Sequence, residues 1–242
     1  MISVCMATYN GEKFLYEQLK SILSQLDWSD EVIVVDDCST DKTYEMLSKI
    51  NDSRLKIFRN NKNEGHIKAF EKSINLSSGD YIFLSDQDDI WIDNRVKLMC
   101  GELASKKFVS SNYDLIDKFG KPIKETLDVA LLAVDSNKWL RNIYLIFRGR
   151  SNYFGCAIAF HKSLKTVVMP FPTFVESHDI WIATAANLLK SVSHIESSTL
   201  LRRIHGANLS VVRRSLSKKL KARFIFLKSI LILICRIFHV EK

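Results

Sequence analysis

The alternation of short apolar runs with helix-like segments in the first ninety residues constrains the fold most strongly. Four runs are expected to be strands: Ile2–Met6, Val32–Val35, Leu55–Phe58 and Tyr81–Leu84. Between the first two, apolar residues recur every three to four positions from Phe14 to Leu26, which is typical of a helix with one buried face. The pattern predicts an α/β fold with a mostly parallel, Rossmann-like sheet and helices on both faces.

Polar clusters follow three of the expected strands. They are Ala7-Thr8-Tyr9-Asn10, Asp36-Asp37 and Asp86-Gln87-Asp88-Asp89. Ligands of parallel α/β sheets bind outside the carboxyl ends of the strands, so we expect these clusters to meet at one edge. The sequence has no glycine-rich phosphate loop of the dinucleotide or triphosphate type. Carboxylates repel phosphate unless a cation such as Mg²⁺ or Mn²⁺ lies between them. The D-x-D motif of Asp86 and Asp88 therefore predicts a metal–diphosphate site, although a lone motif of this kind is also typical of a solvated acidic turn.

The net charge of +8 is concentrated in the last thirty residues, where nine basic residues accompany one acid, Glu241. Residues 1–212 are balanced, so the charge gives no support to nucleic-acid binding by the body. An apolar stripe recurs at helical spacing in this tail: Leu216, Leu220, Phe224, Leu227, Leu231, Ile234 and Phe238. We expect residues 213–242 to form a basic amphipathic helix on an anionic membrane surface. The alternative is a helix that packs on the body or on a second subunit.

The five cysteines, Cys5, Cys38, Cys100, Cys156 and Cys235, are odd in number and show no metal-ligand spacing. Such a set is typical of reduced, mostly buried thiols in a cytosolic protein. The sequence starts directly with the apolar run Ile2–Met6, without a basic region before it. No signal peptide is therefore expected.

Several segments together resemble the family 2 glycosyltransferases of the GT-A fold. They are Ser3–Gly11, Glu31–Asp41, Asn63–Ala69 and Gly79–Asp89 in the first ninety residues, then His178-Asp179-Ile180-Trp181 and Leu201–Asn208. The combination of Asp86–Trp91 with the two later segments is similar to bacterial transferases that build O-antigen, capsule or rhamnan chains. The resemblance implies a metal-dependent, inverting hexosyltransferase that uses a UDP-sugar or dTDP-rhamnose. It implies an acceptor hydroxyl on a growing, lipid-linked surface glycan.

The resemblance also implies roles for residues of the first half. Ala7, Thr8 and Tyr9 match positions that enclose the nucleoside, and Asp36 and Asp37 match acids that hold the pyrimidine and ribose. Asp86 lies where the family contacts the ribose and metal, and Asp88 where it ligates Mn²⁺ or Mg²⁺ between the phosphates. Gln87 need not be a ligand.

In the second half, the resemblance implies that Asp179 is the general base that takes the proton of the acceptor hydroxyl. Read without it, an acid at this position is typical of a helix N-terminus. The family often has an acid before this position, whereas this sequence has His178, and Glu176 is a weaker alternative base. His205 matches a metal ligand of some relatives, with a structural loop histidine as the alternative. Arg203 is expected to neutralise the leaving diphosphate, with a solvated strand residue as the alternative.

The expected organisation has three parts. Residues 1–90 form the donor-binding half, residues 91–212 the acceptor-binding and catalytic half of the same domain, and residues 213–242 the tail. In the second half, Asn94–Leu103 and His178–Leu189 are expected to be helices, and Lys107–Tyr113 and Gly155–Phe160 strands. Residues 114–150 have no clear pattern and are expected to contribute a lobe at the acceptor site.

Two other functions remain open from the sequence. A nucleotidyltransferase also places acids and a metal at a sheet edge, but it would carry a glycine- and lysine-rich triphosphate loop where this chain has Ala7–Gly11. A catalytically silent carbohydrate- or membrane-binding module would not need the complete set of acids. The preferred hypothesis is a glycosyltransferase bound peripherally to the cytoplasmic face of a bacterial membrane.

Overall fold

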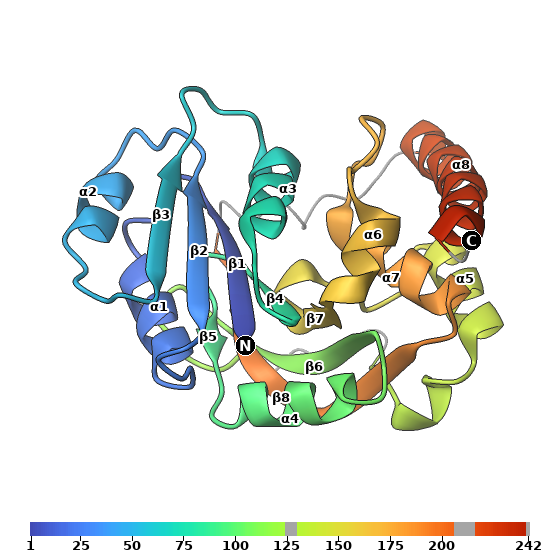
Figure 1. The fold of residues 1–242 in the computed structure, drawn as a ribbon, viewed down its shortest axis with the longest axis horizontal. Coiled ribbons are helices and arrows are strands. Elements are labelled where there is room, and N and C mark those ends of the chain that lie inside the picture. The colour runs from blue at the N-terminus through green and yellow to red at the C-terminus, as the bar shows by residue number, and fades with distance from the viewer. Residues whose placement is uncertain (124–129, 206–215, 241–242) are drawn as a thin grey trace.

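A computed structural model describes residues 1–123, 130–205 and 216–240 of the chain. Its centre is an eight-stranded sheet with the order β3-β2-β1-β4-β7-β6-β8-β5 (Figure 1). The strands are β1 (Ile2–Thr8), β2 (Glu31–Asp36), β3 (Leu55–Arg59), β4 (Tyr81–Ser85), β5 (Ile90–Trp91), β6 (Phe108–Ile116), β7 (Ile158–His161) and β8 (Val192–Arg203). The first four strands are parallel to one another, as expected, so β1, β2 and β4 end at one edge. Their polar clusters therefore begin at a common edge.

The second half of the chain extends the same sheet with mixed strand directions. β7 is antiparallel to both β4 and β6, whereas β6 and β8 are parallel. The short β5 pairs antiparallel with the far end of β8. This pairing joins the segment after Asp89 to the segment before His205. Two parts of the expected site that are distant in the sequence thus lie on adjoining strands.

Helices cover both faces of the sheet, as the apolar pattern predicts. They are α1 (Leu15–Leu23), α2 (Thr43–Ser48), α3 (His66–Leu76), α4 (Arg95–Leu103), α5 (Trp139–Arg148), α6 (Lys165–Val168), α7 (His178–Leu188) and α8 (Leu216–Val240). Neighbouring residues of β1 show the division: Val4 and Met6 pack with α1, α2 and α4, whereas Cys5 packs with α3, α6 and α7. Short 3₁₀ turns at Ala133–Asp135, Gly155–Ala157 and Lys162–Leu164 complete the described elements.

The cysteines are free, as expected, but they are not mostly buried. Cys5 and Cys156 are buried, Cys38 and Cys100 are partly exposed, and Cys235 is exposed on α8. Cys235 is exposed because it lies on the side of α8 that faces away from the core. The prediction of mostly buried thiols is therefore wrong for three of the five positions.

The C-terminal helix α8 is part of the body rather than a detached tail. Leu233 is fully buried and Phe226 nearly so, and both belong to the core shared with α5, α6 and α7. The Arg236 guanidinium donates to the carbonyl oxygens of Val168 (3.0 Å) and Pro170 (2.8 Å). One side of α8 thus packs on the body, as the alternative prediction expected.

The opposite side of α8 carries an exposed apolar ridge. Its members are exposed by 53–71% and recur at helical spacing: Leu220, Phe224, Leu227, Leu231 and Phe238. In the described part of the chain, no helix is both long and apolar enough to cross a bilayer. The expected amphipathic helix is present. One of its sides packs on the body, and the other is exposed.

Candidate active site

A large open cleft of about 2010 Å³ lies along the carboxyl edge of the sheet. One side consists of the segments that follow β1, β2 and β4, including Ala7, Thr8, Tyr9 and Asp37. The other side comes from the end of α5, the start of α7, the end of β8 and the first half of α8. Residues 114–150, which have no clear sequence pattern, contribute Ile146–Arg150 to this wall. The cleft thus joins the two expected halves of the domain.

Gln87, the middle residue of the D-x-D motif, joins the loop after β4 to the loop after β1. Its Oε1 accepts hydrogen bonds from the Thr8 hydroxyl and the Tyr9 N–H (2.9 Å), and its Nε2 donates to the Tyr9 carbonyl (3.1 Å). Gly11 makes this close approach possible, because a Cβ at that position would lie 2.4 Å from the Gln87 Oε1. Gln87 therefore positions the loop of residues 7–11, a role that the sequence pattern did not reveal.

The paired acids after β2 separate into two environments. Asp37 lines the cleft, and its carboxylate accepts from the Asn60 amide (2.8 Å) and from the N–H groups of Glu64 (2.9 Å) and Gly65 (2.7 Å). Asp36 does not line the cleft: it is fully buried, hydrogen-bonded to Ser39 and 3.2 Å from the Arg59 Nε. In this arrangement protein encloses the Asp36 carboxylate, which separates it from the cleft where the expected nucleoside contact would be made.

A cluster of acids and one thiol lies at the end of β4. Ligand atoms of Asp86, Asp89 and Cys156 all lie within 4.8 Å of one another. Burial, followed by the nearby Asp89 and Asp88 charges, raises the pKa of Asp86 well above its ordinary value. Burial and the charge of Asp88 raise the pKa of Asp89 to about 7. A divalent cation would relieve this repulsion, which is the electrostatic setting that a metal–diphosphate site needs.

Asp88 and His205, the two expected metal ligands, lie in contact. The Asp88 Oδ2 is 2.7 Å from the His205 Nε2, although 117 residues separate them in the chain. Among the described residues, the buried Asp89 Oδ2 has no hydrogen-bond partner. Carboxylate oxygens and one imidazole nitrogen are a donor set that suits Mn²⁺ or Mg²⁺. The residues therefore fit a divalent cation, with Asp89 as an additional candidate ligand in the same acidic run.

The arginine that faces the cleft is Arg202 rather than Arg203. Arg203 is 2% exposed, and its guanidinium binds Glu17 (2.6 Å) and the Asp88 carbonyl (2.9 Å). Arg202 lines the cleft and lies over the Phe154 ring at 4.3 Å. Because successive strand residues point to opposite faces, one position along β8 decides which arginine can reach a ligand. The expected placement of Arg203 at the diphosphate is corrected accordingly: Arg203 holds the Asp88–Asp89 segment, and its neighbour Arg202 is one of the cationic residues that line the cleft.

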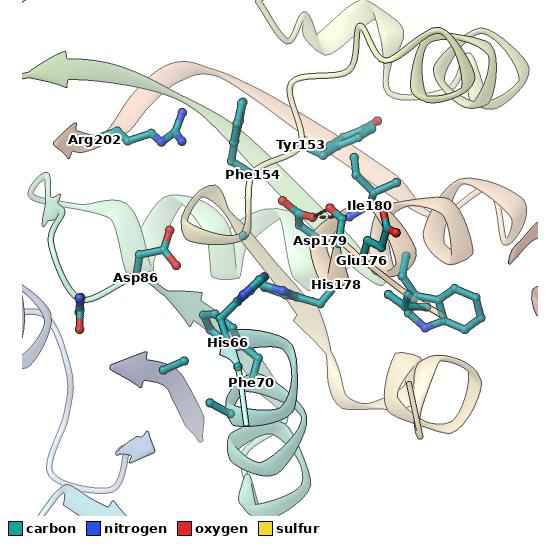
Figure 2. Close-up of a pocket in the computed structure, with 18 of the residues that line it drawn as sticks. His66, Phe70, Asp86, Tyr153, Phe154, Glu176, His178, Asp179, Ile180 and Arg202 are labelled. Carbon is teal, nitrogen blue, oxygen red and sulfur yellow. Dashed lines mark hydrogen bonds between the residues drawn. The ribbon is translucent and has the colours of Figure 1, made fainter. Parts of the chain in front are cut away.

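Asp179 begins α7 and lines the cleft. Its Oδ1 accepts from the Ser177 hydroxyl and from the Ile180 N–H (2.8 Å), whereas Oδ2 makes no hydrogen bond to the described residues. Figure 2 shows Asp179 and Asp86 on opposite sides of the pocket, with the rings of His66 and His178 between them. One carboxylate oxygen is therefore fixed by the backbone while the other remains able to accept a proton.

The neighbours of Asp179 have different roles. His178 is buried and stacks on Phe70 with a centroid distance of 4.3 Å. Burial lowers the pKa of His178 to about 4, so this ring is neutral at pH 7. The Glu176 carboxylate is exposed and lies 2.7 Å from the Lys221 Nζ of α8. Because Glu176, the alternative base, is held in this ion pair, Asp179 is the better candidate for the base.

Comparison with known proteins is consistent with these observations. The sequence model described as "Glycosyl transferase family 2" matches residues 3–168. The UDP-Glc:alpha-D-GlcNAc-diphosphoundecaprenol beta-1,3-glucosyltransferase WfaP of Escherichia coli is 33% identical over 115 residues, covering 47% of this chain and 46% of that protein. The dTDP-rhamnosyl transferase RfbG of Shigella flexneri is 41% identical over 99 residues, covering 38% and 34%. The matched regions thus span half or less of these relatives.

The fold has a counterpart among solved structures. The S. aureus TarS 1-349 structure in complex with UDP-GlcNAc superposes with a TM-score of 0.71 at 20% identity, covering 95% of this chain and 66% of that one. This likeness confirms the expected GT-A fold. The match to the family model covers more than half of the sequence and includes the strand ends that form the donor side of the cleft. The chain therefore belongs to glycosyl transferase family 2.

Proposed function

We propose that this chain transfers a sugar, with inversion, from a nucleoside diphosphate donor to a hydroxyl of a lipid-linked bacterial surface glycan. The observation that carries the proposal is the arrangement of Asp86 on one side of a single cleft and Asp179 on the other, with Asp88 of the same acidic run also lining the cleft. An inverting transfer needs an electrophilic centre held by its leaving group and a base on the opposite side. The names of the relatives, which use UDP-glucose and dTDP-rhamnose, support the two donor classes.

On the donor side, the chain binds and orients the nucleotide. The loop of Thr8 and Tyr9, fixed by Gln87, and Asp37 line the part of the cleft that would hold the nucleoside. Asp88 and His205, with Asp86 and Asp89 beside them, would hold Mn²⁺ or Mg²⁺. When bound, such a cation supplies positive charge to the leaving diphosphate. Arg202 adds a fixed positive charge at the same pocket.

On the acceptor side, Asp179 takes a proton. Its Oδ2 accepts the proton of the acceptor hydroxyl while that oxygen bonds to the anomeric carbon and the bond to the diphosphate breaks. The hydrogen bonds of Oδ1 to Ser177 and the Ile180 N–H keep the carboxylate in one orientation. Because the attack occurs in one displacement, no nucleophilic cysteine or serine is required.

We also propose that α8 binds the protein peripherally to the inner face of the cytoplasmic membrane. The ridge of Leu220, Phe224, Leu227, Leu231 and Phe238 is exposed, and the exposed Lys221 and Lys228 lie on the same helix. Apolar side chains flanked by lysines are typical of helices that lie in an anionic interface. A lipid-linked acceptor would then be presented at the surface where the enzyme is bound.

The test is release of nucleoside diphosphate from a panel of UDP-sugars and dTDP-rhamnose by the purified chain, with Mn²⁺ and a glycan acceptor present. We expect acceptor-dependent release with at least one donor and none with Asp88→Asn. A silent binding module would release nothing with any donor. Release of inorganic diphosphate from a sugar phosphate and a nucleoside triphosphate would instead indicate a nucleotidyltransferase.

A further inference from the structure

Basic residues line the cleft in two places: Lys13 and Arg202 belong to the segments near the acids, and a group of four lies further along. The acids Asp37, Asp86, Asp88 and Asp89 lie at the sheet edge. Four basic residues line the opposite end, where α5 ends and α8 begins: Arg148, Arg150, Lys219 and Arg223. A pocket that only held a cation-bound donor would have no need of a second, basic end. The second basic group indicates that this end receives a different anionic group.

The basic end is built where two helices meet. The Arg223 guanidinium lies over the Phe147 ring at 5.7 Å and donates to the Lys219 carbonyl (2.9 Å). Phe147 in turn contacts Phe226, with ring centroids 6.1 Å apart. The aromatic rings and the guanidinium join the end of α5 to α8 through side-chain contacts, and both helices pack against α7. Phe147, Ile225 and Phe226 also line the cleft, which places apolar surface beside the positive charge.

The positive charge at this end is not neutralised within the described chain. The nearest acid of the lining, Glu176, is already paired with Lys221 at 2.7 Å. Arg148 and Arg223 donate to neutral oxygens, those of the Tyr144 hydroxyl and the Lys219 carbonyl. In the described ranges, the Arg150 and Lys219 side chains form no ion pair. Guanidinium and ammonium groups that converge without carboxylates are suited to phosphate.

We propose that Arg148, Arg150, Lys219 and Arg223 form an acceptor subsite for the diphosphate that joins a glycan to its lipid. This inference rests on the proposed function and names the part of the acceptor that the far end of the cleft binds. Three features follow one another from the cleft to the outside of the protein. Asp179 lines the cleft, the basic cluster borders the first half of α8, and the apolar ridge lies on the outer side of that helix. An apolar chain leaving the diphosphate can therefore run along α8 towards the bilayer.

The test measures binding of farnesyl diphosphate to the full chain with saturating UDP and Mn²⁺, so that the donor side is occupied. Arg150→Gln combined with Lys219→Gln should raise the Kd at least tenfold. The matched control is Lys20→Gln combined with Lys97→Gln, two exposed lysines on α1 and α4, and it should leave the Kd unchanged. Asp88→Asn should also retain farnesyl diphosphate binding, because its side chain belongs to the donor side. Equal binding by the Arg150/Lys219 variant and the wild type would overturn the proposal.

Two further arms identify the source of the phosphate. Inorganic diphosphate should bind at least tenfold more weakly than farnesyl diphosphate, and equal affinity would overturn the assignment to a lipid-linked group. Flotation with phosphatidylglycerol vesicles should be retained by the Arg150/Lys219 variant; loss of flotation in parallel with farnesyl diphosphate binding would mean that these residues serve the membrane surface instead. Because these measurements need no transfer, a failed donor panel would count against the proposed function without deciding the subsite.

Discussion

At the scale of single residues, Asp179 is held as a general base should be. A backbone N–H and a serine hydroxyl fix Oδ1, and Oδ2 makes no hydrogen bond to the described residues, as the proposed role requires. We expect Asp179→Asn to lower turnover by about 10²-fold or more, because an amide cannot take the proton. The Kd of the nucleotide donor should remain within about twofold, because Asp179 begins α7 on the other side of the cleft.

The matched control for Asp179 is Glu176→Gln. Its carboxylate is paired with Lys221, so this change should leave turnover near that of the wild type. Steady-state release of nucleoside diphosphate measures both variants. Normal turnover in Asp179→Asn with a loss in Glu176→Gln would move the base to Glu176.

The acidic cluster predicts that metal binding depends on pH. The pKa of Asp89 is raised to about 7, so below pH 7 this carboxyl keeps a proton that a cation must displace. Affinity for Mn²⁺ should therefore increase with pH, by about tenfold between pH 6 and pH 8 if one proton is released. Calorimetric titration at the two pH values measures it. Asp89→Asn should reduce the difference, and an equal Mn²⁺ affinity at both pH values in the wild type would show that no such proton is displaced.

The positions of single side chains were the hardest feature to predict from the sequence. Asp86, Asp88 and His205 could be predicted because their segments match a family pattern, and the structure brings them together. Sequence alone could not predict whether Arg202 or Arg203 lines the cleft. This depends on how β8 pairs with β5, and the two strands are far apart in the chain. The burial of Asp36 is similar: only the fold shows that Ser39 and Arg59 enclose its carboxylate.

At the scale of elements, local periodicity predicted most of the first half. The strands β1–β4 end within two residues of their expected positions because each is a compact apolar run between polar loops. The helix α2 begins at Thr43, whose N–H donates to the Asp41 carboxylate (2.9 Å). The helix α5 and the strands β5 and β8 were not predicted. The strand β5 has only two residues and is defined by its pairing with β8. No local sequence pattern could predict this long-range pairing.

The packing of α8 predicts that its two sides respond differently to truncation of a leucine. Leu233→Ala removes a fully buried side chain and should lower the free energy of unfolding by about 2–5 kcal/mol. Leu231→Ala changes a side chain that is 66% exposed and should alter it by less than about 0.5 kcal/mol. Urea unfolding followed by circular dichroism measures both. Similar small effects of the two changes would mean that α8 does not belong to the core in solution.

At the scale of the whole molecule, the exposed ridge of α8 is the membrane contact that we propose. We expect Leu227→Glu combined with Leu231→Glu to abolish flotation with phosphatidylglycerol vesicles at low salt. The wild type should float, and added salt should weaken its binding because the attraction is partly electrostatic. Leu76→Glu combined with Leu98→Glu, which changes exposed leucines on α3 and α4, is the control and should float normally. Unchanged flotation of the α8 variant would exclude the ridge as the membrane contact.

The cleft as a whole bears on the proposed mechanism: if the donor and the base Asp179 act from opposite sides, the sugar is transferred in one displacement. The most direct measurement is the anomeric configuration of the product, determined by NMR for the donor that the chain uses. The account predicts that this configuration is inverted relative to the donor. Retention of configuration would contradict it, because retention requires either a second displacement or attack from the side of the leaving diphosphate.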